Sequence, residues 1–391
     1  MPQEKTISMD RINIIVKVTD GCNLRCKYCY NKDSDYEKEV LTLERFTKLL
    51  DVVAPYRKDI HIIWHGGEPL TAGREYFENA MRIEDAACTK YRVKIKNQIQ
   101  TNGTLIDKKW VELFKKYDIK PGISFDGIDN EKYRQKTADT LRAFKLLNKN
   151  GMRTAAMAVV ADDEYNILEN YKYFAGLGIN VEFSPVFDEG GAAEMGSRAQ
   201  RFAEKMVELF DYWLYDKTGV DVRLFCTYVS MALGTDFRIC NNSSCHGKYL
   251  GIGADGTIYN CGRYSVTEYP FGNIDDFSSL DEIYRTDGFR ALVAGAIERR
   301  KKCKENCEYF DLCSGGCTDC AIIENGLNNI PEQSCMYFKT LYSHIKATVD
   351  QIVADKIPLV GFNPYFRKAV IKSFAVTDDS TGADIQDKYQ K

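Results

Sequence analysis

The sequence lacks the features that mark several large classes of protein. Its 391 residues contain no apolar run near the roughly 20 residues of a membrane-spanning helix, and Met1–Met9 has no apolar core like that of a signal peptide. Nine prolines and 44% hydrophobic residues exclude a collagen-like, mucin-like or disordered chain. Lysine and arginine (53) nearly balance aspartate and glutamate (56), so no strong positive field attracts nucleic acid. We therefore expect a cytoplasmic protein that binds neither membranes nor nucleic acid.

Histidine is scarce as well, with four residues in the whole chain, whereas cysteine is abundant, with 14. Nine of the cysteines fall between Cys240 and Cys335, and only Cys88 and Cys226 stand alone. The remaining three are Cys22, Cys26 and Cys29. In a reducing compartment such groups are more often metal ligands than disulfides. Because histidine is rare, a metal site here would be rich in thiolate, which favours iron–sulfur clusters or zinc.

Alternating strand and helix patterns predict an α/β fold up to about residue 190. The β-rich apolar runs that predict strands are Ile12–Val18, Ile60–Trp64, Val93–Gln100, Gly122–Phe125, Thr154–Val160 and Val181–Val186. The segments with helical periodicity between them are Leu43–Val53, Arg74–Thr89, Asp107–Tyr117, Leu141–Asn150 and Tyr165–Leu177. Asp107 is placed to cap a helix, and Gly151 and Gly178 are placed to end two others. Such alternation implies parallel strands with right-handed crossovers, so we expect an open or partial α/β barrel, with a doubly wound sheet as the alternative.

The rest of the chain has a different pattern. Asp188–Arg198 is rich in glycine and alanine and is expected to form a mobile loop, and the tail beyond Val376 is expected to be disordered. Between them the sequence predicts two helices and a cysteine-rich region with short strands, many turns and a basic run. These segments are, in chain order, Ala199–Tyr215 (helix), Tyr249–Ile252 and Thr257–Asn260 (strands), Arg299–Lys304 (basic run) and Met336–Ile352 (helix).

The first three cysteines follow the first predicted strand directly, after Asp20-Gly21. In a parallel barrel this position is the carboxyl end of a strand, where loops carry catalytic groups. Three thiolates at this spacing can hold three irons of a cubane cluster and leave the fourth iron open to a substrate or cofactor. The alternative is structural, because positions i, i+4 and i+7 share one helix face, on which cysteine packs as a small apolar residue. Asn23, Arg25 and Lys27 crowd the segment and argue against that burial.

The pattern Cys-x3-Cys-x2-Cys, with Tyr28 before the last cysteine, resembles the signature of the radical S-adenosylmethionine (SAM) enzymes. The resemblance implies that these cysteines hold a four-iron four-sulfur (4Fe-4S) cluster whose fourth iron binds SAM. It also implies cleavage of SAM to methionine and a 5′-deoxyadenosyl radical that abstracts a substrate hydrogen. Gly66-Gly67-Glu68-Pro69, Gln100–Thr104 and Ser124–Gly127 resemble the SAM-side segments of the family. The SAM-contacting residues implied in this way are Tyr28, Gly66, Gly67, Glu68, Asn102, Ser124, Asp126 and Arg134.

The later cysteines resemble those of the SPASM extension, which carries two auxiliary 4Fe-4S clusters and so implies three clusters in total. By this resemblance, one auxiliary cluster would be held by Cys240, Cys245, Cys261 and Cys317, and the other by Cys303, Cys307, Cys313 and Cys335. Three residues separate Cys303 from Cys307 where the usual pattern has two, and Cys320 is left without a role. A zinc ribbon is the alternative, since zinc also takes cysteine pairs in short turns, and it would make the region structural.

The chain is accordingly expected to have three parts. Residues 1–225 would form a partial (β/α)6 barrel of the radical SAM type, residues 226–340 a SPASM domain, and residues 341–391 a C-terminal helix and flexible tail. Because the first predicted strand starts near Ile12, we expect no N-terminal leader-binding domain of the kind that many peptide maturases carry.

SPASM enzymes mostly act on peptides or proteins, so the resemblance implies a peptide or protein substrate and a flavodoxin- or ferredoxin-like electron donor. Anaerobic sulfatase-maturing enzymes, one subfamily, carry an aspartate base directly after the cysteine that matches Cys261. Here Gly262 and Arg263 follow instead, and His65 stands where that subfamily usually has glutamine. A missing carboxylate removes the general base that would take the substrate's proton.

We therefore favour a ribosomal-peptide maturase that forms an intramolecular thioether or carbon–carbon crosslink, with Arg263 and His65 as candidate catalytic residues. One alternative is formylglycine formation by a sulfatase-maturing enzyme. A more remote alternative is a non-catalytic scaffold that binds metal.

Overall fold

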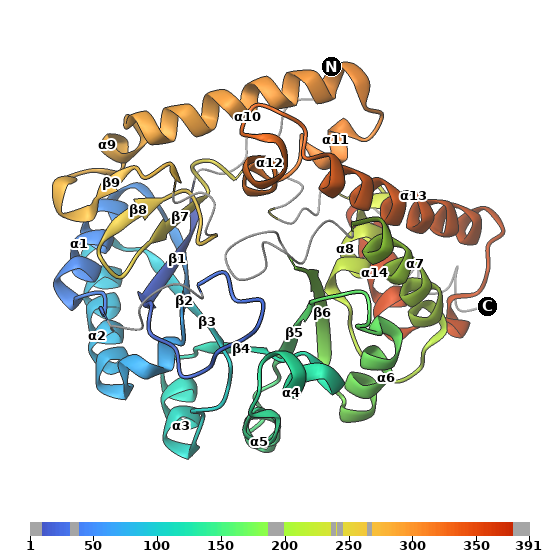
Figure 1. Cartoon of the computed structure of the whole chain (residues 1–391), viewed down its shortest axis with the longest axis horizontal. Helices are drawn as coiled ribbons and strands as arrows, with labels where there is room; N and C mark the ends of the chain where they lie inside the picture. The colour runs from blue at the N-terminus through green and yellow to red at the C-terminus, as the bar shows by residue number, and fades with distance from the viewer. Residues whose placement is uncertain are drawn as a thin grey trace.

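Six parallel strands and the helices between them make up the first half of the chain (Figure 1). The computed structural model describes residues 10–31, 39–186, 199–235, 240, 245–263 and 268–377. The strands are β1 (Arg11–Thr19), β2 (Asp59–Gly66), β3 (Lys94–Thr101), β4 (Lys120–Ser124), β5 (Ala155–Val160) and β6 (Asn180–Pro185). Each pairs in parallel with the next along the chain. All six predicted strands are confirmed, with ends that differ by at most two residues.

The connecting helices lie on the outer face of the sheet and present an apolar side to it (Figure 1). They are α1 (Leu43–Val53), α2 (Arg74–Tyr91), α3 (Lys108–Lys116), α4 (Asn130–Tyr133), α5 (Thr137–Lys149) and α6 (Ile167–Leu177). The predicted cap at Asp107 is confirmed, because its carboxylate accepts a hydrogen bond from Trp110 N at 2.9 Å. Gly178 ends α6 with φ +65°, a left-handed conformation that glycine adopts without strain, and Gly151 lies just beyond the end of α5.

Aromatic rings fill the space between β2 and the first three helices. Successive ring centroids are 5.0, 5.3 and 5.6 Å apart. The rings belong to Phe46, Trp64, Phe77 and Trp110. Two consecutive buried hydrogen bonds extend from this cluster. Trp64 Nε1 donates to Asn97 Oδ1 at 2.8 Å, and Asn97 Nδ2 donates to Glu84 Oε2 at 2.6 Å. Burial raises the pKa of the Glu84 carboxyl to about 8.

Three short strands from the cysteine-rich region extend the same sheet. They are β7 (Tyr249–Ile252), β8 (Thr257–Tyr259) and β9 (Gly272–Asn273), of which the first two confirm predicted strands. β7 pairs in parallel with β1, and β8 and β9 follow as antiparallel strands. The sheet order is β6-β5-β4-β3-β2-β1-β7-β8-β9. From β1 to β6 the strands follow chain order without a reversal, and their connecting helices lie on one face, which confirms the expected partial barrel and excludes the doubly wound sheet. In the described part of the chain β6 and β9 are free edges, so the barrel is open.

Two groups of helices complete the structure. The first group packs together beside β6 and consists of α7 (Ala199–Tyr215), α8 (Arg223–Ala232), α13 (Glu332–Ala354) and α14 (Pro364–Thr377) (Figure 1). The second group surrounds the cysteines and consists of α9 (Leu280–Tyr284), α10 (Asp287–Asn306), α11 (Phe310–Cys313) and α12 (Thr318–Asn325). α7 and α13 confirm the two predicted helices. No described helix is long and apolar enough to cross a membrane. The predicted loop at Asp188–Arg198 lies outside the described residues, and so does the tail from residue 378 onward.

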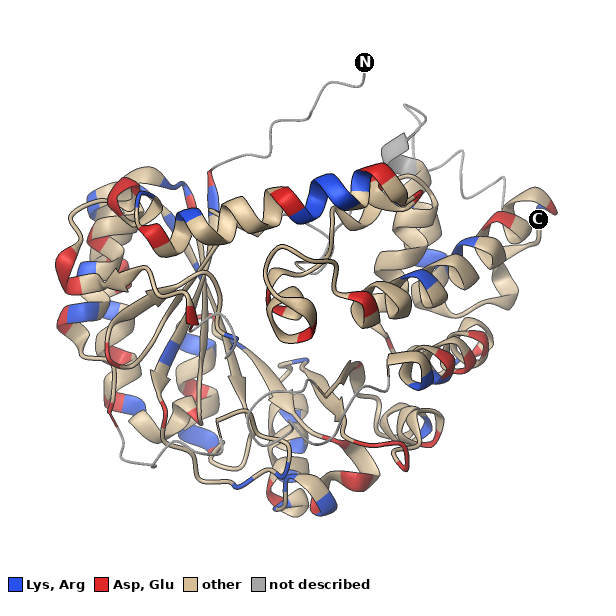
Figure 2. Ribbon diagram, turned by 45° about the horizontal axis from the view of Figure 1, so that its top comes forward, with Lys and Arg blue, Asp and Glu red and all other residues tan. Residues whose placement is uncertain are grey.

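The basic run Arg299–Lys304 lies on α10, which is a long helix in a region where turns were expected (Figure 2). Arg299 is buried and donates to the carbonyl oxygens of Gly315 and Leu327, at 2.9 and 2.6 Å, and to Thr318 Oγ1 at 3.0 Å. This arginine therefore holds the loop between α11 and α12 against α10. Elsewhere, charges of both signs are spread over the ribbon (Figure 2).

Candidate active site

The loop that follows β1 carries three cysteines to a cavity at the carboxyl ends of the parallel strands. Cys22, Cys26 and Cys29 all line this cavity, which has a volume of about 440 Å³ and is called the strand-end cavity below. Backbone hydrogen bonds shape the loop: Leu24 N donates to Cys22 Sγ at 3.4 Å, and Cys29 N donates to the Cys26 carbonyl at 3.2 Å. The structure thus brings the three predicted thiols to one opening.

Two glycines allow the chain after β2 to press against the loop that precedes the first cysteine. A Cβ on Gly66 would collide with the carbonyl oxygen of Thr19, and one on Gly67 would collide with that of Gly21. Gly67 N donates to Thr19 O at 2.8 Å, and Glu68 N donates to Gly21 O at 2.9 Å. Only glycine fits both positions, so the strand-end cavity has a wall of bare backbone beside the thiols, which suits close approach of a cofactor.

Glu68 does not line the strand-end cavity, although the sequence analysis expected it to contact SAM. Its Oε1 accepts hydrogen bonds from Leu70 N at 3.1 Å and Thr101 Oγ1 at 2.7 Å, and its Oε2 accepts one from Asn102 N at 2.7 Å. Burial raises the pKa of this carboxyl to about 7, although the three donors oppose that shift. The side chain therefore ties the ends of β2 and β3 together, which positions the residues that do face the cavity.

Asp126 has a comparable role behind the cysteine loop. Its buried carboxylate accepts hydrogen bonds from Tyr28 Oη, from Arg134 Nε at 3.1 Å and from Val159 N at 3.0 Å. Tyr28 and Arg134 both line the strand-end cavity, and the guanidinium lies 5.2 Å from the centroid of the tyrosine ring. Arg134 Nη1 is also 4.0 Å from Cys26 Sγ. A positive charge beside a thiolate stabilises it, so Arg134 suits a cysteine that ligates metal.

Asn102 and Ser124 line the strand-end cavity, as expected from the sequence. Asn102 Nδ2 donates to Asn23 Oδ1 at 2.8 Å, which joins the end of β3 to the cysteine loop. Gln100 Nε2 donates to Ser124 Oγ at 2.8 Å, which leaves the serine hydroxyl hydrogen free to donate into the cavity. These groups give the cavity a polar side that faces an apolar side formed by residues such as Ile15.

His65 also lines the strand-end cavity. Burial and the nearby Lys17 lower the pKa of its imidazole to about 4, so the ring is neutral at neutral pH. Met157 on β5 and Ser184 on β6 complete the wall, and sequence reasoning did not single them out. A signal for them existed in the alternation of inward and outward residues along these two strands.

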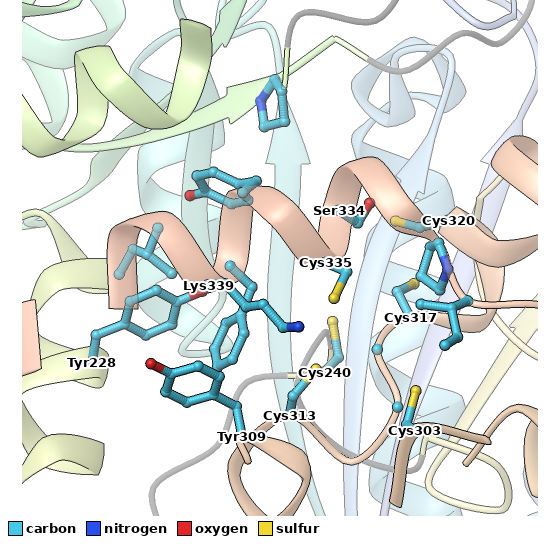
Figure 3. Close-up of a pocket in the computed structure, with 18 of the residues that line it drawn as sticks. Tyr228, Cys240, Cys303, Tyr309, Cys313, Cys317, Cys320, Ser334, Cys335 and Lys339 are labelled. Carbon is cyan, nitrogen blue, oxygen red and sulfur yellow. The ribbon is translucent and has the colours of Figure 1, made fainter. Parts of the chain in front are cut away.

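A second cavity, of about 470 Å³, lies between the sheet and the cysteine-rich helices and is called the C-terminal cavity below. The thiols that line it are Cys240, Cys303, Cys307, Cys313, Cys317, Cys320 and Cys335. Figure 3 shows several of their sulfur atoms directed into the same space. Among the described residues, no three histidine, cysteine or acidic side chains converge on a point where a single metal ion would sit. The thiols instead surround an open volume that has the donor chemistry of an iron–sulfur site.

The thiols fall into two neighbourhoods. The pKa of the Cys313 thiol is raised to about 11, mainly by burial and next by the charges of Cys335 and Cys303. These three sulfurs are therefore neighbours. Burial, followed by the charges of Cys317 and Cys240, raises the pKa of Cys245 to about 12. Cys261 is buried near Cys317 as well. Cys307 lies near Cys303 and so joins the first neighbourhood, whereas the assignment of the two groups to two clusters stays a prediction.

Cys320, which has no role in those sets, is buried and lines the C-terminal cavity. Its hydrogen bond to Cys317 lowers the pKa of the Cys317 thiol to about 7. The other two unassigned cysteines lie away from both cavities. Cys88 is on α2, and Cys226, on α8, donates from Sγ to Asp221 Oδ1 at 3.1 Å.

Arg263 lines both cavities and so lies where they meet. Its guanidinium forms an ion pair with Asp319 on α12, whose side chain is only 2% exposed. The backbone N–H of Arg263 donates to Cys261 Sγ at 3.4 Å. Neighbouring Gly262 faces β1, where a Cβ would lie 2.5 Å from Ile15 Cγ2. The residue after Cys261 therefore has no room for a side chain, and the charge of Arg263 is balanced by a buried carboxylate.

Comparisons with known proteins agree with this arrangement. Residues 16–171 match the radical SAM superfamily, and residues 240–320 match the SPASM iron–sulfur cluster-binding domain. A cysteine-type anaerobic sulfatase-maturating enzyme of Clostridium perfringens is 27% identical over 339 residues, which cover 80% of this chain and 90% of the relative.

Two solved structures share the fold. Native anSMEcpe with bound AdoMet and Cp18Cys peptide has a TM-score of 0.75 at 24% identity, over 88% of this chain and 99% of that chain. Streptococcus suis SuiB bound to precursor peptide SuiA has a TM-score of 0.57 at 19% identity, over 83% and 76% respectively. The domain matches and the two thiol-lined cavities lead to one conclusion. Residues 16–171 are a radical SAM domain and residues 240–320 a SPASM iron–sulfur cluster-binding domain, and together these domains imply SAM binding and 4Fe-4S clusters.

Proposed function

We propose that the protein modifies a ribosomally made peptide by forming an intramolecular thioether or carbon–carbon crosslink. A peptide substrate is supported by the relatives, one named for sulfatase maturation and two with peptides bound in their structures. The observation that carries the choice of reaction is the closed position after Cys261. Gly262 lies against Ile15, which leaves no room there for the carboxylate base that formylglycine formation needs. The charged residue that follows, Arg263, cannot accept a proton at neutral pH.

The cluster and SAM, when bound at the strand-end cavity, supply a 5′-deoxyadenosyl radical that removes a hydrogen atom from the substrate. The residues of the chain bind and orient the cofactor and the substrate, and they shield the reacting atoms from water. Asn102 and Ser124 offer hydrogen-bonding groups to the polar parts of the cofactor, and Arg134 supports the Cys26 thiolate. The apolar side of the cavity keeps water from the reacting atoms. His65 is neutral at neutral pH, so its imidazole has one hydrogen-bond donor and one acceptor with which to orient the cofactor or the substrate.

Formylglycine formation remains the second candidate, because the sulfatase-maturating relative covers most of the chain at 27% identity. Membership in an enzyme superfamily removes the non-catalytic scaffold from consideration. The two reactions leave different products, so one experiment separates them.

The reconstituted enzyme is incubated anaerobically with SAM and reductant, together with either of two kinds of peptide. One kind is encoded by short reading frames beside the gene, and the other is a synthetic sulfatase-type peptide with a Cys-x-Pro-x-Arg site. A crosslink appears in mass spectrometry as a loss of two hydrogens, together with suppressed fragmentation between the joined residues. An aldehyde at the cysteine of the synthetic peptide, trapped by a hydrazide, would instead establish formylglycine formation.

Three clusters per chain are also part of the proposal, in place of a structural zinc ribbon. Full occupancy gives about 12 iron atoms per chain. Cys261→Ala and Cys335→Ala each remove one ligand from a different neighbourhood of thiols. Each variant is therefore expected to lose about four iron atoms per chain. Unchanged iron content in both variants would contradict the arrangement. The proposed donor, a flavodoxin- or ferredoxin-like protein, is tested by asking whether reduced flavodoxin supports SAM cleavage in place of a chemical reductant.

A further inference from the structure

The C-terminal cavity has a second end, beyond Cys313 and away from Cys317 and Cys320, that the functions above do not use. Figure 3 shows Tyr228 and Tyr309 together at this end, at a distance from Cys317 and Cys320. Tyr337 lines the same cavity from α13. Below, these three tyrosines and Glu182 are called the aromatic end of the C-terminal cavity.

Glu182 is a half-buried residue on β6 that lines the C-terminal cavity. Its Oε2 accepts one hydrogen bond, from Leu224 N at 3.1 Å. Among the described residues no cation lies within ion-pair distance of this carboxylate, and its other oxygen accepts no hydrogen bond. Burial makes the charged form of a carboxylate costly, and it raises the pKa of Glu182 to about 7, although the Leu224 N–H and Arg223 oppose that shift. Such a group is stabilised when a ligand brings it a positive charge.

The rings around Glu182 suit such a ligand. Tyr228 on α8 packs 5.5 Å from Phe338 on α13, and Tyr309 packs 6.3 Å from the same phenylalanine, so the walls are aromatic and held in place. The faces of aromatic rings attract cations, most strongly where water is excluded. A carboxylate among tyrosines is a combination that binds ammonium or guanidinium groups.

We propose that the aromatic end binds a cationic side chain of the substrate, lysine or arginine, with its charge on Glu182 and its stem against the tyrosine rings. This inference rests on the proposed function, because it assumes a peptide substrate. The C-terminal and strand-end cavities share Met157, Ser184 and Arg263 as walls, so a peptide whose reacting residue enters one cavity can place a neighbouring side chain in the other. The aromatic end would then select peptides with a basic residue close to the reacting one.

The other charged and titratable groups near Glu182 come from the start of α8 and from α13. Arg223 lowers the pKa of Glu182, and Asp221 raises it. Cys226, Tyr228 and Tyr337 are neutral neighbours, since burial raises the pKa of each above its usual value. Arg223 is exposed and lines the same cavity, so it competes with an incoming cation for Glu182. Lys339 on α13 is a second cation that lines this cavity (Figure 3).

The test measures binding without turnover. The holoenzyme with SAM is titrated calorimetrically with N-acetyl-lysine methylamide, N-acetyl-arginine methylamide and the neutral N-acetyl-norleucine methylamide. The two cationic probes are expected to bind at least tenfold more tightly than the neutral one. Glu182→Gln keeps an acceptor for Leu224 N and is expected to abolish that preference. Glu208→Gln, which alters an exposed carboxylate on α7, is the matched control and is expected to keep it. Equal binding of all three probes to the native protein would overturn the proposal, and so would an unchanged preference in Glu182→Gln.

The pH dependence supplies a second measurement that needs no variant. Only the ionised carboxylate pairs with a cation, and lysine stays charged over this range. With the pKa of Glu182 at about 7, affinity for the lysine probe is expected to fall by about tenfold from pH 8 to pH 6. Affinity that is flat with pH would contradict the role of Glu182. If the probes bind as expected and no peptide is modified, the proposed function is wrong and the cation site stands. If peptides are modified and the probes show no cation preference, the cation site is wrong and the proposed function stands.

Discussion

Gly262 and Ile15 lie in direct apposition, with the position of a Cβ on Gly262 only 2.5 Å from Ile15 Cγ2. Both residues line the strand-end cavity, so a side chain at position 262 would push Ile15 toward the space where SAM is expected. The same contact that excludes a base after Cys261 also helps to shape the cofactor site.

Gly262→Ala is therefore expected to destabilise the protein by about 1–3 kcal/mol and to weaken SAM binding, because an overpacked contact forces its neighbours to move. The measurements are the thermal unfolding midpoint and a SAM titration. Adding Ile15→Ala removes the colliding methyl group, so the double variant should be less destabilised than the sum of the two single changes. Gly176→Ala on α6, where nothing lies within 4 Å of the added Cβ, is the control and should cost nothing. Full additivity of the pair would show that the contact is not the cause.

Replacing Cys22, Cys26 and Cys29 together with alanine should abolish SAM cleavage and leave most of the iron bound. The eight auxiliary ligands lie elsewhere in the chain, so about eight of 12 iron atoms should remain. Iron analysis and chromatographic detection of 5′-deoxyadenosine provide the readouts. Production of 5′-deoxyadenosine by the triple variant would show that another site cleaves SAM.

The pair Arg263 and Asp319 allows a structural role to be separated from a catalytic one. Arg263→Ala leaves Asp319 buried without its partner and should cost about 1–3 kcal/mol of stability. Adding Asp319→Asn removes the stranded charge and should recover most of that loss. If Arg263 orients the substrate, the stable double variant still forms less peptide product per 5′-deoxyadenosine. Restored product yield in the double variant would reduce Arg263 to a structural residue.

Glu84 makes stability depend on pH in a defined direction. Burial raises the pKa of this carboxyl to about 8, above its value in the unfolded chain, so the native state binds more protons between the two values. Its contribution to stability is full in acid and is lost as pH rises toward about 8, by on the order of 1 kcal/mol per pH unit. In urea unfolding at pH 6, 7 and 8, the free energy of unfolding of Glu84→Gln should rise relative to that of the native protein as pH rises. Glu75→Gln, at an exposed position on the same helix, should track the native protein.

The barrel and the cysteine loop could be predicted from the sequence because their signals are local. Strands such as Ile60–Trp64 are rich in apolar and β-branched residues, and the three cysteines stand within eight residues of one another. α10 was missed because Leu292 is the one large apolar residue among its buried residues, and the others, Gly295, Ala296, Arg299 and Cys303, form no apolar stripe.

Tertiary pairings escaped prediction for a different reason. Arg263 meets Asp319, and Glu182 meets Tyr337, only when separate elements of the fold come together. Glu68 and Asp126 were recognised as important from their motifs, but the direction of their carboxylates depends on donors from other strands and helices. The local sequence shows which residue types are present, but it does not show which residues from other elements will contact them.

The parallel pairing of β7 with β1 has a consequence for how the chain can be divided. β1 lies in the middle of the sheet only because β7 covers one of its edges, with Asn13 to Val16 in register with Tyr249 to Ile252. A fragment that ended before β7 would present the backbone of β1, whose alternate residues are buried and apolar, as an open template for pairing with other chains. The radical SAM region and the SPASM region are therefore one cooperative unit, and the isolated barrel should aggregate when expressed alone.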